Sequence, residues 1–119
     1  MIREEICFNE YPVEYLVFKI EETASIKEFL ELQQKVWTKY LSSFDAFVSE
    51  EIWINKENPG EIHKIVVWKS MDGWKDICPI ELKEKDEEFK KLYNKPFQIT
   101  RRLHKEYNHG LYRVKLFYK

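Results

Sequence analysis

Residues 13–20 read VEYLVFKI and carry apolar side chains at both odd and even positions. Apolar character on both faces predicts a β-strand that is covered from both sides. The residues before it, 1–12, mix glutamates with isoleucine, cysteine and phenylalanine. We interpret this opening segment as an extra edge strand or an arm.

A stripe of apolar residues at helical spacing follows. Ser25 and Glu28 fit a capping box, in which the hydroxyl and the carboxylate satisfy free backbone N–H groups at the start of a helix. The stripe consists of Ile26, Phe29, Leu30, Val36, Trp37, Tyr40 and Leu41. Gln33 interrupts it, and an unpaired buried amide costs about 1–3 kcal/mol. Gln33 is therefore expected either to find a hydrogen-bond partner or to face a cavity.

Two further apolar stretches predict a β-hairpin. Residues 46–54 and 61–69 are rich in β-branched and aromatic side chains. Between them, 55–60 (NKENPG) is typical of a turn. Later in the chain, 97–103 and 111–118 predict two more strands.

The stretch between this hairpin and the later strands predicts two helical segments. Ser70 can cap a short helical turn over 71–77, and Pro79 suits the first turn of a longer helix. The apolar face of that helix consists of Leu82, Phe89, Leu92 and Tyr93. Its charged residues are interpreted as a solvated face, except Asp86, which helical spacing places beside the apolar stripe.

The predicted order of elements is β-α-β-β-α-β with an additional C-terminal strand. This order is that of the ferredoxin-like fold, an α+β architecture in which two helical regions cover one face of an antiparallel sheet. We therefore expect residues 1–119 to form a single domain. Residues 1–12 and 105–119, with a turn at 108–110, are interpreted as additions to it.

The predicted strands carry apolar residues on both faces, which has a consequence for assembly. Val66 and Trp68 point one way from their strand, whereas Ile65 and Val67 point the other way. Because helices cover only one face, the other would be a large exposed apolar patch, which monomers rarely tolerate. Packing of two sheets about a two-fold axis buries such a patch, so a homodimer through the sheet face is expected.

Composition and charge exclude several classes of function. The 119 residues include 20 Lys or Arg and 21 Asp or Glu, without the basic excess of a nucleic-acid-binding surface. With only three glycines there is no phosphate-binding loop. Charges interrupt every apolar stretch before the about 20 residues needed to span a membrane, and Cys7 and Cys78 form no CxxC pair. We expect free thiols and a cytoplasmic protein without nucleic-acid or membrane partners.

Tryptophans recur in four short runs: VWT at 36–38, EIWIN at 51–55, WKS at 68–70 and WKDI at 74–77. The dipeptide NP at 58–59 lies between the second and third of them. Over roughly residues 13–104 this pattern resembles a family of small bacterial proteins without an assigned activity. That family is related to the antibiotic biosynthesis monooxygenases and belongs to the dimeric α/β barrel superfamily. The resemblance implies a ferredoxin-like dimer with a hydrophobic pocket between sheet and helices in each subunit, and it implies no particular reaction.

Two chemistries of this superfamily bear on cofactors. Haem-degrading members use an Asn on the first strand, and a Trp and a haem-ligating His near the second helical region. This chain has Val17 or a neighbour and Ile77 at those places, and no histidine between Lys64 and Leu103, so haem degradation is not expected. Cofactor-free monooxygenases hold a phenolic substrate with Asn, Trp and basic groups. That chemistry stays open, and no cofactor is expected.

The aromatic share of the sequence, 16%, supplies candidate ligand contacts. The residues predicted to bind a ligand are Gln33, Trp37, Trp53, Trp68, Trp74, Asp86 and Phe89. The four tryptophans lie on different elements that the fold would bring toward one core. There they either fill that core or wall a pocket for a flat apolar ligand, to which Gln33 and Asp86 would add polar contacts.

The histidines give weaker signals. His63 lies among apolar residues of a strand, where it is either a general base or a solvent-exposed residue at the strand end. His104 and His109 flank a predicted turn without further ligands at metal-binding spacing, so no metal site is expected. No nucleophile–histidine triad can be defined, and catalytic residues stay unassigned.

Two classes of function stay open. The first is a homodimeric α/β barrel protein that binds a small hydrophobic or aromatic molecule in each subunit, with cofactor-independent monooxygenase-like oxidoreductase chemistry as its enzymatic form. The second is a non-catalytic dimerisation or ligand-carrier domain whose aromatic residues only form core. A continuous pocket lined by several tryptophans beside Gln33 or Asp86 would favour the first. Tight packing, with the Gln33 amide bonded to backbone, would favour the second.

Overall fold

The computed structural model describes residues 6–103 and 111–116. In chain order the elements are β1 (Ile6–Ile20), η1 (Thr23–Ser25), α1 (Ile26–Leu32), η2 (Gln33–Thr38), α2 (Lys39–Leu41), β2 (Phe47–Ile54), β3 (Glu61–Trp68), α3 (Met71–Lys75), α4 (Pro79–Leu92), β4 (Phe97–Leu103) and β5 (Tyr112–Leu116). The predicted strands and helices are therefore present in the expected order. The turn predicted at 108–110 and the two histidines beside it, His104 and His109, lie outside the described residues.

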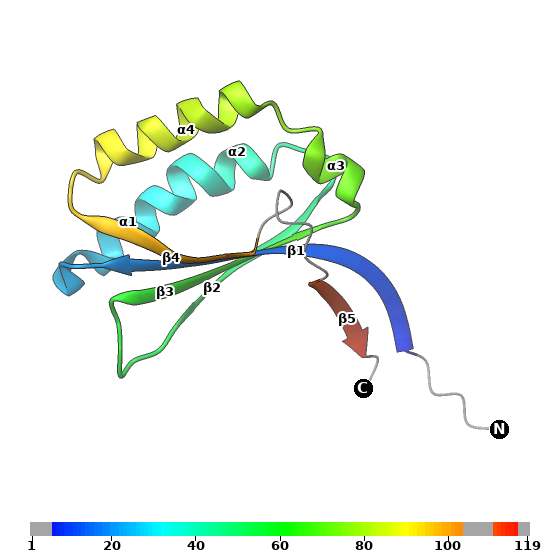
Figure 1. The fold of residues 1–119 in the computed structure, drawn as a ribbon, viewed down its shortest axis with the longest axis horizontal. Helices are drawn as coiled ribbons and strands as arrows, with labels where there is room; N and C mark the ends of the chain where they lie inside the picture. Colours follow the sequence, from blue (N-terminus) through cyan, green and yellow to red (C-terminus); the bar gives the residue numbers. More distant parts are fainter. Residues whose placement is uncertain (1–5, 104–110, 117–119) are drawn as a thin grey trace.

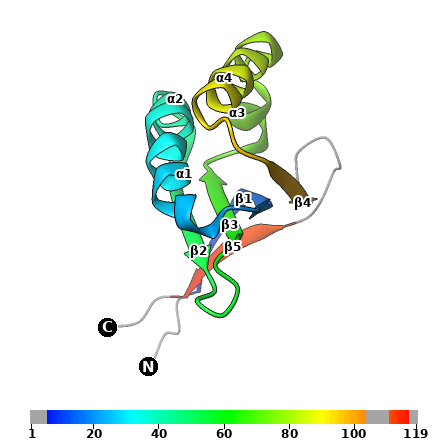
Figure 2. The ribbon, with the colours of Figure 1, turned by 90° about the vertical axis from the view of Figure 1, so that its left-hand side faces the viewer.

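The strands form an antiparallel sheet with the order β2-β3-β1-β4, and β5 pairs with β1 outside this path. The helices lie on one side of the sheet in Figure 1, and the turned view in Figure 2 shows the same layering. The predicted ferredoxin-like arrangement is confirmed. We call the side that faces the helices, which carries Lys64 and Trp68, the helix side. The opposite side, which carries Tyr15, Trp53 and His63, is called the open side.

Strand β1 is longer than predicted because it takes part in two sets of pairings. Its second half lies between β3 and β4, with Val13 opposite Val67 on β3. Its first half pairs with β5, with Ile6 opposite Leu116. Figure 1 shows this first half curving away from the rest of the sheet, with β5 beside it. Part of the opening segment is therefore strand.

Two clusters of buried apolar side chains hold the helices on the sheet. The larger consists of Phe18, Ile20, Phe29, Val36, Ile62, Phe89 and Tyr93. The second consists of Leu41, Val66, Trp68, Trp74 and Ile77. In the larger cluster the Phe29 ring meets the rings of Phe89 and Tyr93 edge to face, with centroids 5.3 and 5.1 Å away, an arrangement that stabilises aromatic pairs.

The start of the first helix differs from the prediction. The Ser25 hydroxyl makes no capping bond to the helix. It donates to the carbonyl of Glu22 at 2.6 Å and lies 2.7 Å from the buried Tyr93 hydroxyl, while Glu28 pairs with Lys95. The predicted capping box is therefore wrong. The 3-10 turn η1 precedes the helix and directs the Ser25 hydroxyl inward, where Tyr93 and a backbone carbonyl engage it.

The later helices begin as predicted. The Ser70 hydroxyl accepts a hydrogen bond from the Gly73 backbone N–H at 3.0 Å at the start of α3. Pro79 occupies the first turn of α4, where its missing N–H costs nothing. Within the described residues, no helix is both long enough and apolar enough to cross a membrane.

Candidate functional site

A cavity lies between the helices and the helix side of the sheet. Its volume is ≈ 300 Å³, at the lower end of the range for small-molecule pockets. Its apolar wall consists of Leu16, Phe18, Trp37, Leu41, Trp68, Trp74, Ile77, Leu82 and Ile99. Its polar groups come from Glu14, Lys64, Lys83, Asp86, Lys90 and Arg102. The cavity thus combines an aromatic lining with more cationic than anionic side chains.

Two tryptophans stack against one another in the cavity wall. Trp68 is the last residue of β3 and Trp74 lies in α3, and their rings are nearly parallel with centroids 6.2 Å apart. Trp68 is completely buried, yet its indole N–H has no hydrogen-bond partner among the described residues. A buried donor without an acceptor costs about 1–3 kcal/mol.

Lys64 is the most unusual residue of the wall, because it is a lysine whose exposed fraction is only 3%. Its Nζ donates to Gln33 Oε1 at 3.1 Å and lies 3.3 Å from Glu50 Oε2. It also lies 5.2 Å from the centre of the Trp37 ring. Lysine is almost never fully buried unless it is paired. Here a carboxylate, an amide oxygen and an aromatic face together compensate the desolvated charge.

The segment η2 supplies three of the groups around this pair. It is a π-helical stretch, wider than an α-helix, and such stretches are frequent at functional sites. Gln33 and Trp37 reach Lys64 from it. Thr38, at its end, donates its hydroxyl proton to the second oxygen of Glu50. Because Glu50 belongs to β2, one wide helical turn and two strands together hold a buried amine and a buried carboxylate in contact.

Gln33 has found a hydrogen-bond partner, one of its two expected outcomes. Its side chain is 2% exposed, and its amide oxygen is bonded to Lys64 rather than to backbone. Its Nε2 group has no partner within the part of the chain that the structure describes. Gln33 is not part of the cavity wall and is linked to it through Lys64.

The structure brings four of the seven predicted ligand-binding residues together in the cavity wall: Trp37, Trp68, Trp74 and Asp86. Gln33 lies behind this wall and accepts a hydrogen bond from Lys64, which is part of the wall. Asp86 is half-buried and forms an ion pair with Lys90 at 2.8 Å, one helical turn along α4. A role for these residues in ligand binding stays a prediction.

Trp53 and Phe89 lie elsewhere. Trp53 is 61% exposed on the open side, and its indole N–H donates to Glu51 at 3.0 Å. The expectation that all four tryptophans meet in one core is wrong for Trp53, because its neighbour Ile52 takes the inward position on β2 and packs against the larger cluster. Phe89 is 1% exposed within that cluster and is not part of the cavity wall.

Lys64, Glu50 and Arg102 belong to the site but were not predicted from the sequence. A signal for the first was present, because Lys64 lies between Ile62 and Val66 in the inward-facing register of β3. A charge at such a position must be paired if the strand is buried. Glu50 lies opposite Val66 on the neighbouring strand, so the same alternation places it on the same side.

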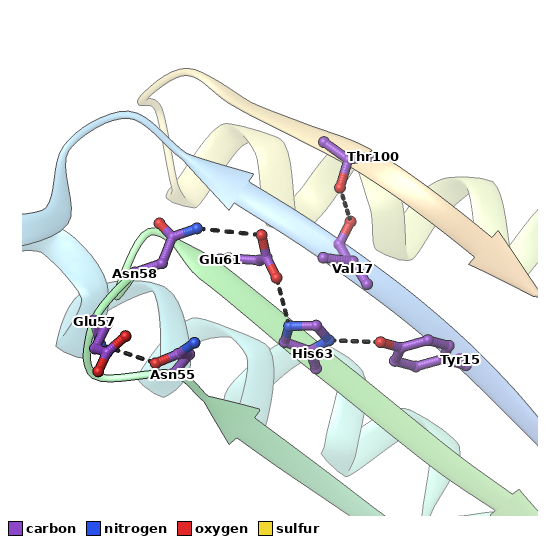
Figure 3. A network of polar contacts seen from close by, with 8 residues as sticks. All are labelled: Tyr15, Val17, Asn55, Glu57, Asn58, Glu61, His63 and Thr100. Atoms are coloured by element: carbon purple, nitrogen blue, oxygen red, sulfur yellow. Dashed lines mark hydrogen bonds and ion pairs between the residues drawn. The ribbon is translucent and has the colours of Figure 1, made fainter.

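The open side of the sheet carries a polar network, drawn in Figure 3. The Tyr15 hydroxyl lies 2.6 Å from His63 Nδ1, and His63 Nε2 lies 2.8 Å from a carboxylate oxygen of Glu61. Because the carboxylate accepts the Nε2 proton, Nδ1 is left to accept the Tyr15 proton. Asn58 donates to the other Glu61 oxygen at 3.3 Å, and the Arg101 guanidinium lies 5.9 Å from the centre of the Tyr15 ring.

His63 is therefore more constrained than an exposed residue at a strand end. Its side chain is 24% exposed and both ring nitrogens are engaged. Among the described residues, no group of three or more histidine, cysteine or acidic side chains is placed to hold a metal ion.

A third polar contact ties the helices together. The Tyr40 hydroxyl donates to Glu81 at 2.7 Å and so joins α2 to α4. Burial raises the pKa of the Tyr40 phenol above its ordinary value, and the hydrogen bond to Glu81 raises it further. The Lys85 ammonium lies 5.5 Å from the centre of the same ring.

No protein-family model and no curated protein matches this sequence. Several solved structures do match the fold. SnoaB, a cofactor-independent oxygenase from Streptomyces nogalater, is 12% identical, with a TM-score of 0.54 over 83% of this chain and 93% of SnoaB. A dimeric ferredoxin-like protein from an uncultured marine organism is 14% identical, with a TM-score of 0.52 over 78% of this chain and 86% of that protein.

An antibiotic biosynthesis monooxygenase-like protein from Bordetella bronchiseptica is 12% identical, with a TM-score of 0.51 over 73% of this chain and 90% of that protein. At these identities the likeness is one of fold. The resemblance noted from the tryptophan-containing runs is confirmed at that level. This chain has the fold of the antibiotic biosynthesis monooxygenase-like proteins.

Proposed function

We propose that this protein binds a planar, largely apolar molecule in the cavity on the helix side of the sheet. Three tryptophans wall the cavity, and aromatic walls suit flat ligands. The observation that carries the proposal is this cavity of ≈ 300 Å³ between sheet and helices, in which the aromatic wall meets the cationic side chains of Lys64, Lys83, Lys90 and Arg102. These cations suit a ligand that carries an oxygen acceptor.

We further propose cofactor-independent oxygenase chemistry as the enzymatic form of this function. The shared fold with SnoaB, itself a cofactor-independent oxygenase, supports this choice. In such a reaction the cationic side chains of the wall, Lys64 among them, would stabilise negative charge on an oxygen of the substrate. A protein that binds the same molecules without consuming oxygen would be a ligand carrier.

Two copies are proposed to associate through the open side of the sheet. Trp53 is 61% exposed there, and Tyr15 and Arg101 lie on the same side. Tryptophan, tyrosine and arginine are the residue types most enriched in protein interfaces, and the marine fold neighbour is dimeric. Light scattering should give the mass of two chains. The mass of a single chain at every concentration would contradict the proposal.

Tryptophan fluorescence tests the ligand-binding proposal. Naphthalene and 2-naphthol should quench the emission, because either molecule would lie against three tryptophans. The control variant Trp53→Phe removes the exposed indole and should leave the binding curve unchanged. Leu82→Phe narrows the cavity and should weaken binding by about tenfold through overpacking. If neither compound quenches the emission, the protein does not bind flat aromatic molecules in this cavity.

Oxygen consumption separates the enzymatic form from the carrier. An oxygen electrode should record uptake with a dihydroxynaphthalene. Uptake should be lost in Gln33→Ala, which leaves Lys64 without its amide partner. Quenching without oxygen uptake would identify a carrier.

A further inference from the structure

We propose that Lys64 is a covalent carbonyl-binding residue, whose amine forms an imine with an aromatic aldehyde or ketone held in the cavity. The inference rests on the proposed function, because the carbonyl compound must enter the same cavity. The inference goes beyond the proposed function because it assigns a bond-forming residue and a chemical class of ligand.

The first support is the position of the amine. Lys64 lines the cavity and is 3% exposed, on a rigid central strand. A lysine in a largely apolar pocket is the usual position of a Schiff-base lysine. Lys83 lines the same cavity but is exposed, so the chain contains a matched lysine that lacks this environment.

The second support is a proton acceptor in contact with the amine. Glu50 Oε2 lies 3.3 Å from Lys64 Nζ, and the two side chains are 6% and 4% exposed. As the carbonyl compound reacts, this carboxylate accepts one proton from the ammonium and so acts as a general base. The amine keeps its bond to Gln33 Oε1 and gains a free electron pair.

The reaction then balances with these groups alone. The Lys64 nitrogen attacks the carbonyl carbon, a C–N bond forms, and the carbonyl oxygen takes a proton that leaves the nitrogen, giving a carbinolamine. Protonated Glu50 returns its proton to the new hydroxyl, the C–O bond breaks, and one water molecule leaves. The product is an iminium ion, so the position keeps the positive charge that Glu50 and the Trp37 ring compensate. No oxidant or reductant takes part.

The third support is the lining of the cavity. Trp37 lies 5.2 Å from the amine and Trp68 and Trp74 complete the aromatic wall. These rings would hold the aryl part of the carbonyl compound and keep water away from the C–N bond, which favours condensation over hydrolysis. Confinement of amine and carbonyl in one cavity also raises their effective concentration.

Reductive trapping tests this inference. The protein is treated with equimolar 2-naphthaldehyde and sodium cyanoborohydride, which converts an iminium ion to a stable amine, and peptide mass spectrometry locates the adduct. Lys64 should carry at least about tenfold more adduct than Lys83, because Lys64 has the Glu50 carboxylate in contact as a proton acceptor. Glu50→Gln should slow the labelling of Lys64 by about a hundredfold, the usual contribution of a general base.

The variant Lys64→Arg tests the covalent step. Arginine keeps a positive charge beside Glu50 and Trp37 but cannot form an imine, so labelling of the protein should fall to that of its exposed lysines. Circular dichroism confirms that the variant is folded. If Lys83 and other exposed lysines are labelled as heavily as Lys64 in a protein that 2-naphthol quenches, the imine inference is wrong and the proposed function stands. If neither naphthalene nor 2-naphthol quenches the unmodified protein, both are wrong.

Discussion

The two sides of the sheet carry similar polar groups in very different surroundings. On the helix side, the Lys64 and Glu50 side chains are 4% and 6% exposed. On the open side, those of His63 and Glu61 are 24% and 41% exposed. Lys64 and His63 are neighbours in the sequence, so one step along β3 moves an ionisable group from the interior to the surface. Water solvates the second pair, whereas the first depends on its protein partners alone.

The tryptophans should show the largest difference between the two sides. Trp68→Ala removes a fully buried ring that stacks on Trp74, and it should lower the free energy of unfolding by about 3–5 kcal/mol. Trp53→Ala removes an exposed ring and should change it by less than about 0.5 kcal/mol. Urea denaturation measures both. Equal losses would show that burial does not distinguish the two sides.

The ion pairs on the two sides should show the second-largest difference in their contribution to stability. Lys64→Met leaves the buried Glu50 carboxylate without its cation, which should cost about 3 kcal/mol of unfolding free energy. The double variant Lys64→Met, Glu50→Gln removes the stranded charge and should recover at least half of that loss. On the open side, Glu61→Gln should cost less than about 1 kcal/mol. A double variant no more stable than Lys64→Met would refute the account of the buried pair.

Self-association should depend on the open side. Trp53→Asp introduces a charge at the exposed tryptophan and should raise the dissociation constant of the proposed dimer by at least tenfold, or about 1.4 kcal/mol. Sedimentation equilibrium measures it. The helix-side variant Leu82→Phe should leave the constant unchanged, and a similar effect of both variants would argue against an interface on the open side.

The polar network of the open side should contribute less. Tyr15→Phe removes one hydrogen bond to a half-buried histidine and should cost about 1 kcal/mol. The exposed Tyr112→Phe serves as the matched control and should cost nothing measurable. Thermal unfolding of the two variants checks this, and a neutral Tyr15→Phe would mean that water replaces the lost bond.

The contact between α2 and α4 should give the smallest effect. Tyr40→Phe removes the bond to Glu81, a group at the surface, and should cost less than about 1 kcal/mol near neutral pH. Because the folded protein raises the pKa of the Tyr40 phenol, this contribution should persist up to the ordinary tyrosine value and disappear as the pH rises further. The difference in stability between wild type and Tyr40→Phe, measured against pH, should shrink only in strongly alkaline solution.

Local patterns in the sequence were enough to predict the elements. Alternation within β3 separates Val66 and Trp68 from Ile65 and Val67, and it needs only neighbouring residues. Helix starts at Ser70 and Pro79 likewise depend on side chains within one turn. The helix start at Ser25 was mispredicted because the Ser25 hydroxyl is hydrogen-bonded to the hydroxyl of Tyr93, a residue far away in the sequence.

The candidate site follows from contacts between distant segments. Trp53 lies between Ile52 and Ile54. Alternation places the two isoleucines on one side of the strand and Trp53 on the other, but it could not tell which side faces the helices. Gln33, Glu50 and Lys64 belong to three different elements, and each is an ordinary polar residue until the fold removes water from around it. The sequence by itself determined the strands, the helices and their order, because periodicity acts over a few residues. Only the tertiary structure decided which polar groups are buried together, because burial and pairing depend on what the rest of the chain brings to the same place.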